Sequence, residues 1–143
     1  MFNPSRDQVR QFFFDAWEKF RRGLPLSDLE AIAVEHIGRH SEYHALLEQP
    51  ERSRDKDWLP EMGETNPFLH LSMHLSISEQ LTIDQPAGVR AHYNALLSGL
   101  GDEHAAQHAV MDCLAEMIWR AQRDNRPPDG AAYLLCIEKK CLS

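Results

Sequence analysis

The chain has 143 residues, of which 43% are hydrophobic and 26% are charged, and its net charge is −7. This composition is ordinary for a globular protein, and the length suits a single domain over residues 1–143. The acidic balance excludes a general nucleic-acid binder, which would show a basic face. No apolar run approaches the roughly 18 to 20 residues that cross a bilayer, and the N-terminus has no signal-peptide pattern. We therefore expect a cytoplasmic protein without nucleic-acid or membrane partners.

The first predicted helix covers residues 4 to 22, with Asn3 as its cap and Pro4 at its first position. Its apolar stripe consists of Val9, Phe13, Trp17 and Phe20. The consecutive side chains of Phe12, Phe13 and Phe14 cannot all face one core, so this helix is also the candidate contact of a homodimer.

A second predicted helix begins at a capping box formed by Ser27 and Glu30 and continues to about residue 47, where Pro50 stops it. Residues 50–66 are charged and contain Pro60 and Gly63, so we expect them to form the longest loop. Trp58 would either anchor this loop or fold it over the bundle as a partial lid.

Three further helices and a short last one follow in the second half of the chain. They are expected at residues 67–82, from 84 to about 99, at 102–124, and after Pro127-Pro128 to about Lys139. No segment has the pattern of a strand. The sequence therefore predicts an all-α fold, an up-and-down helical bundle of about four main helices plus one or two short ones.

Histidines are the most informative residues, because six of the eight form three pairs at the same spacing. The pairs are His36 and His40, His70 and His74, and His104 and His108. Residues four apart share one face of a helix, so each pair can direct two imidazoles at one point. Imidazole is a common ligand for iron, zinc, copper and nickel.

The first two pairs lie in the middle of the apolar stripes of their helices, whereas His104 and His108 lie on a second face with Met111, Ala115 and Trp119. A single buried histidine is usually structural. Burying five or more without partners would cost on the order of 1 to 3 kcal/mol for each unsatisfied group, and a metal ion removes that cost. Together the pairs favour a metal site, with iron as the first candidate and zinc or manganese as alternatives.

Carboxylates and cysteines add less to this ligand set. Glu103 is the best carboxylate candidate, because it projects towards the main apolar stripe of its helix. The three cysteines form no paired framework, so no structural disulfide is expected, and Cys113 would pack as a small apolar residue. Cys136 and Cys141 lack the spacing of a CxxC site. His44 and His92 could each be a ligand, a residue that supports a ligand, or plain core.

Several motifs resemble known families. Histidines on four helices over residues 28–124 resemble the hemerythrin-like bundles and the metal-binding bundles of the DinB type, although histidines stand where hemerythrin has a glutamate. The segments 66–71, 73–75, 84–86, 113–122, 127–129 and 132–134 are similar to a family of short proteobacterial proteins, known as a domain of unknown function, number eighteen forty-one. That resemblance spans nearly the whole chain and implies a fold without a mechanism.

Two functions from different classes remain open. The first is a metal-binding bundle with one or two ions, whose chemistry could be redox, the binding of a small oxidant, or metal-dependent hydrolysis. No nucleophile motif, phosphate loop or dinucleotide fingerprint accompanies the histidines, so neither a reaction nor a small-molecule substrate is indicated. The alternative is a metal-free interaction module with a hydrogen-bonded histidine core, which acts through a protein partner.

Overall fold

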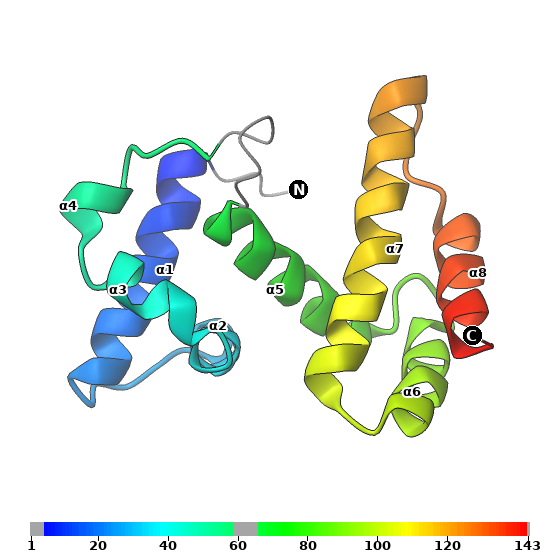
Figure 1. Cartoon of the computed structure of the whole chain (residues 1–143), viewed down its shortest axis with the longest axis horizontal. Coiled ribbons are helices and arrows are strands. Elements are labelled where there is room, and N and C mark those ends of the chain that lie inside the picture. The colour runs from blue at the N-terminus through cyan, green and yellow to red at the C-terminus, as the bar shows by residue number, and fades with distance from the viewer. Residues whose placement is uncertain (1–4, 59–65, 143) are drawn as a thin grey trace. The chain divides into compact units, whose positions relative to one another are not determined.

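The computed structural model describes residues 5–58 and 66–142, and all regular elements within those ranges are helices (Figure 1). The predicted all-α fold class, a helical bundle, is confirmed. In chain order the elements are α1 (Arg6–Arg21), α2 (Asp28–Gly38), the 3₁₀ turn η1 (Ser41–Tyr43), α3 (His44–Leu47), α4 (Pro50–Ser53), α5 (Pro67–Ile83), α6 (Val89–Leu100), α7 (Glu103–Asp124) and α8 (Gly130–Cys141). None of the described helices has the length and apolar character needed to cross a membrane.

The chain divides into two compact units, Met1–Leu75 and Ser76–Ser143, and the boundary falls within α5. Each unit is described below by itself. The expectation that residues 1–143 form a single domain remains a prediction.

In the first unit, α1 begins at Arg6 with Ser5 as its N-cap, and the predicted cap Asn3 and first residue Pro4 lie outside the described residues. The Ser5 hydroxyl accepts from the Gln8 amide, and the Gln8 side chain accepts from the Ser5 amide, which makes a reciprocal cap. Phe13 and Phe14 are both buried, and Phe12 packs against the same core. This core therefore takes up most of the phenylalanine run that suggested a dimer contact.

The second predicted helix is shorter than expected, because α2 ends at Gly38 instead of continuing to residue 47. The Arg39 and His40 amides donate to the carbonyls of His36 and Ile37, the tight bonding that closes a helix end. His40 has φ −122° and ψ 69°, outside the helical region. The prediction that His36 and His40 share one helix is wrong, and His40 lies in the turn before η1.

The segment predicted as a long loop contains α4, which begins at Pro50. Arg10 of α1 holds the chain that follows: its guanidinium donates to the carbonyls of Ser53, Arg54 and Lys56 at 3.3, 2.8 and 2.8 Å. Trp58 is half-buried, with its ring centroid 5.7 Å from that of Phe68. Trp58 therefore acts as the predicted anchor, whereas Pro60 and Gly63 lie outside the described residues.

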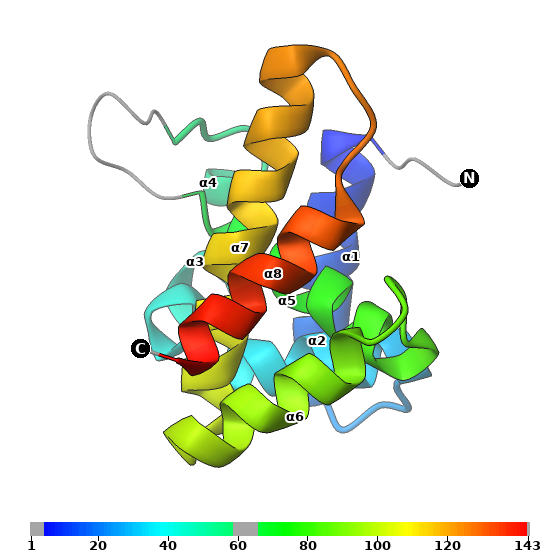
Figure 2. The same cartoon turned by 90° about the vertical axis from the view of Figure 1, so that its right-hand side faces the viewer.

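In the second unit, α6, α7 and α8 pack against one another in pairs, and Figure 2 shows α8 beside α7. The buried side chains include Val89, Tyr93, Val110, Leu114, Tyr133 and Ile137. The Tyr133 hydroxyl donates to Gln80 Oε1 at 2.6 Å and so ties α8 to the last turns of α5. α6 begins at Val89 rather than at the predicted residue 84, because Asp84 and Gly88 have positive φ angles of 53° and 95°, outside the helical region.

The expectation of no structural disulfide is wrong. Cys113 of α7 is joined to Cys136 of α8, 23 positions later in the sequence. The odd number of cysteines argued against a disulfide, but two of the three are paired and the third, Cys141, is a free and exposed thiol. Cys113 is buried as predicted, but as half of a covalent link between two helices.

Candidate metal centre

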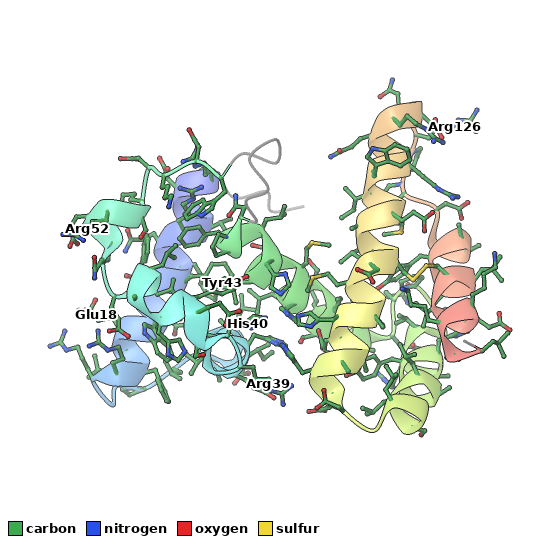
Figure 3. The ribbon with its side chains drawn as sticks, viewed as in Figure 1. Glu18, Arg39, His40, Tyr43, Arg52 and Arg126 are labelled. Carbon is green, nitrogen blue, oxygen red and sulfur yellow. A yellow bond between two sulfur atoms is a disulfide. The ribbon has the colours of Figure 1, made fainter. Side chains whose placement is uncertain are left out.

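Four of the predicted ligands gather in the first unit. His36 comes from the last turn of α2 and His40 from the turn that follows, while His70 and His74 lie one helical turn apart on α5. Figure 3 labels His40, together with Tyr43 of η1. His36, His40 and His74 are buried, with exposures of 4%, 3% and 0%, and His70 is half-buried. The chain thus places imidazoles from two separate segments in one cluster that is mostly buried from solvent.

Three imidazole nitrogens of this cluster converge. His40 Nε2 lies 3.1 Å from His70 Nε2, and His74 Nε2 lies 3.2 Å from the same His70 nitrogen. Two ligands at about 2.0 to 2.1 Å from one zinc ion are separated by roughly 2.9 to 3.4 Å, depending on the angle between them. The observed separations fall within that interval.

A backbone contact sets the proton position on His40. His40 Nδ1 lies 2.7 Å from the His36 carbonyl oxygen, which can only accept a hydrogen bond, so Nδ1 carries the proton. In the neutral ring Nε2 then has a lone pair directed at His70. A carbonyl that holds the other ring nitrogen in this way is the usual support of a metal-ligating histidine.

Two aromatic neighbours position the cluster. The His36 ring stacks on the His74 ring, with centroids 4.5 Å apart and planes 20° apart. The Tyr43 ring stacks on His40 with centroids 5.2 Å apart and an interplanar angle of 1°. Burial first, and the charge of Glu42 second, raise the pKa of Tyr43, which keeps its phenol neutral. Sequence reasoning did not select Tyr43, although it lies three residues after His40 in a turn.

The third predicted pair lies in the first turns of α7, in the second unit. The rings of His104 and His108 are in edge contact with centroids 4.1 Å apart, and both side chains are half-buried. The two residues can each present a nitrogen within 4.8 Å of the other. Helical spacing therefore gives this pair the predicted geometry, and its half-buried state agrees with its place on the second face of the helix.

The predicted carboxylate is less favourably placed. Glu103 is the first residue of α7 and is exposed. A negative charge there is stabilised by the helix N-terminus, which accounts for a glutamate at that position without a metal. Glu35, adjacent to His36, is also exposed, and it pairs with Arg39 at 3.2 Å.

The two histidines with open roles make backbone hydrogen bonds. His44 Nε2 lies 2.9 Å from the Ile37 carbonyl oxygen, and its ring packs on Trp17 with centroids 4.5 Å apart. His92 Nδ1 lies 2.8 Å from the carbonyl oxygen of Gly88, the N-cap residue of α6. Both rings therefore have a structural hydrogen bond, and neither belongs to the converging nitrogens of His40, His70 and His74.

The chain belongs to the family described as a domain of unknown function (DUF1841), whose model matches residues 5–139. The similarity that the sequence showed to this family is thereby confirmed. Searches of curated proteins and of solved structures returned no match. The resemblance to hemerythrin-like and DinB-type bundles remains a prediction from motif spacing.

Proposed function

We propose that this protein is a histidine-rich metal-binding bundle that holds one or two transition-metal ions. One ion is bound by His40, His70 and His74, and His104 and His108 contribute two further imidazoles to metal binding. The observation that carries the proposal is the convergence of three Nε2 atoms at 3.1 and 3.2 Å.

Hydrogen bonding alone accounts poorly for these two short contacts. The proton on Nδ1 leaves His40 Nε2 as an acceptor, so His70 Nε2 would have to donate to it. The single proton on that His70 nitrogen would then also have to serve the contact with His74 Nε2. One ion with a lone pair from each ring meets all three nitrogens at once and needs no shared proton.

The donor set limits the choice of metal. Imidazoles suit zinc, iron, copper and nickel, whereas manganese prefers carboxylate oxygens and water. Iron, the first candidate from the sequence, and zinc fit the converging imidazoles better than manganese does. A metal held by three protein ligands keeps a position for water or a small oxidant, so redox and hydrolytic chemistry are both open to it.

The test is metal content, measured by plasma mass spectrometry on untagged protein purified without chelator or metal resin. We expect one or two equivalents of iron or zinc. The His70→Ala protein should lose at least one equivalent of metal, because His70 Nε2 takes part in both short contacts. Less than about a tenth of an equivalent in the wild-type protein, persisting after reconstitution, would overturn the proposal.

His44→Ala is the matched control. His44 lies in the same unit and is half-buried, but its Nε2 bonds to the Ile37 carbonyl. We expect its metal content to equal that of the wild type. An equal loss of metal from both variants would mean that either change merely unfolds the unit.

The alternative function, a metal-free interaction module, has one observation in its favour. A hollow of about 380 Å³ in the first unit is lined mainly by apolar side chains of Val9, Phe12, Leu29 and Leu75, and Leu29 is 49% exposed. If this face of α1 is the contact of a homodimer, Leu29→Asp should convert dimer to monomer in sedimentation. A wild-type monomer at high concentration would exclude that contact.

A further inference from the structure

The two half-cystines of the second unit differ in their access to solvent. Cys113 is 1% exposed, within the packed core of α7, whereas Cys136 is half-buried on α8. Thiol–disulfide exchange requires the incoming thiolate to approach one of the two sulfurs directly. Cys136 offers the more open approach, so attack at Cys136 is favoured over attack at Cys113.

Cys136 lines two surface hollows of the second unit. The first, of about 210 Å³, also includes Cys113 and Arg126, and the second, of about 310 Å³, includes Lys139 and Lys140. Both contain Glu116 and Arg120. An incoming molecule can therefore be seated against the Cys136 sulfur instead of meeting it on a flat surface.

The charge around the second hollow is opposite in sign to that of the whole chain. Its lining combines three cations, Arg120, Lys139 and Lys140, with the carboxylate of Glu116, which pairs with Arg120 at 2.7 Å and lies 3.9 Å from Cys136 Sγ. Lys140 pairs with Asp112 at 3.3 Å, so three cations face two carboxylates and one positive charge remains, while the chain carries −7. Cations beside a cysteine stabilise its thiolate and attract an anionic reactant. The hollow thus favours a negatively charged partner at the accessible sulfur.

We infer that Cys113–Cys136 is a redox-active disulfide that exchanges with small anionic thiols, such as glutathione, by attack at Cys136. In the first step the thiolate bonds to Cys136 Sγ, the Cys113–Cys136 bond breaks, and Cys113 leaves with the electron pair and takes up a proton. A second thiolate then attacks the outer sulfur of the mixed disulfide and releases Cys136 as a thiolate. The balance is two thiols oxidised to one disulfide and one protein disulfide reduced to a dithiol.

The first test locates the mixed disulfide. Oxidised Cys141→Ser protein, which lacks the exposed third thiol, is treated with reduced glutathione, quenched in acid and mapped by peptide mass spectrometry. We expect glutathione on Cys136. Adduct on Cys113, or no reduction of the disulfide by glutathione while the folded protein persists, would overturn the inference.

Variants that keep one cysteine each make the asymmetry measurable without relying on the transient intermediate. With glutathione disulfide, the Cys113→Ser/Cys141→Ser protein should accumulate a stable adduct on Cys136. The Cys136→Ser/Cys141→Ser protein should react at least about tenfold more slowly, since burial withholds its remaining thiol. Circular dichroism of both proteins identifies any that fail to fold, and equal rates in two folded variants would contradict the inference.

The second test addresses the charge of the partner. Rates with 2-mercaptoethanesulfonate, 2-mercaptoethanol and cysteamine are compared per unit of thiolate. We expect the anionic reagent to be the fastest and the cationic one the slowest, and Lys139→Glu to slow the anionic reagent by about threefold or more. Equal rates for all three reagents would overturn the assignment to anionic thiols.

Discussion

His40 Nε2 and His70 Nε2 lie 3.1 Å apart, although the two residues are 30 positions apart in sequence. His40 reaches this position from a turn, where its other ring nitrogen is held by the His36 carbonyl. His70 reaches it from a helix, where His74 follows on the same face. A turn and a helix therefore direct imidazole nitrogens to one point. His36 contributes its backbone carbonyl, so the role of its side chain can be tested separately from those of His40, His70 and His74.

Replacement of His36 by phenylalanine should retain the metal ion. The structure shows His36 stacked on His74 at 4.5 Å, and a phenylalanine ring keeps that contact while removing both nitrogens. We expect metal affinity to fall by about tenfold, as for residues that orient a ligand, without loss of stoichiometry. Competition with a chromogenic chelator measures both the metal affinity and the number of ions bound. If His36→Phe loses the ion as completely as His70→Ala, His36 is itself a ligand.

Replacement of both His104 and His108 by alanine should lower metal binding. The pair lies in edge contact at 4.1 Å on the first turns of α7, and we propose that it supplies two imidazoles. The measurement is metal content together with the dissociation constant, and His92→Ala is the control from the same unit, since its Nδ1 bonds to the Gly88 carbonyl. Unchanged content and affinity in the double variant would remove the pair from the proposal.

The sequence predicted the parts of this fold that follow from local rules. Helical periodicity and capping residues located α5 and α7 to within a residue or two, because Pro67 and Asp102 mark their starts. The histidine pairs on α5 and α7 were predicted from the same helical periodicity. What local rules missed was the break after Gly38: the apolar pattern continues to Leu47, and only the backbone bonds of Arg39 and His40 show where the helix closes.

Contacts between distant segments could not be predicted in the same way. The Cys113–Cys136 disulfide depends on how α7 packs on α8, and an odd cysteine count argues against any pairing. Likewise, the convergence of His40 with His70 depends on the turn that replaces a helix at residue 40. The sequence identified the chemical types of the candidate ligands, and tertiary packing determined which of them meet.

Replacement of Arg10 by methionine should destabilise the first unit by about 2 to 3 kcal/mol. Arg10 is 3% exposed and donates to the carbonyls of Ser53, Arg54 and Lys56, and its guanidinium carbon lies 4.8 Å from the centre of the Phe68 ring. Methionine preserves the apolar stem but leaves the carbonyls without this donor, at a cost of about 1 to 3 kcal/mol for each buried group that stays unsatisfied.

Urea unfolding measures this difference, and Arg22→Met is the control. Arg22 is highly exposed and pairs with Glu18 at 3.7 Å, so its loss should change the free energy of unfolding by less than about 1 kcal/mol. Similar effects of the two substitutions would show that the Arg10 hydrogen bonds add no net stability.

Alkaline pH should destabilise the protein through two phenols, the half-buried Tyr43 and the buried Tyr133. Burial raises the pKa of both Tyr43 and Tyr133 above the usual value of about 10. Each phenol therefore ionises more readily in the unfolded chain than in the folded protein. Their contribution to stability is fully present below about pH 10 and is lost as the pH rises through the folded pKa values.

Tyr133→Phe separates this effect from the hydrogen bond of the same group. At pH 8 the substitution should cost about 1 kcal/mol, because it removes the 2.6 Å bond from the Tyr133 hydroxyl to Gln80. Between pH 9.5 and 11, roughly the range where an unperturbed phenol ionises, the variant should lose less stability than the wild type. Urea unfolding across this range gives both quantities. Parallel losses in the two proteins would mean that Tyr133 ionises equally in the folded and unfolded states.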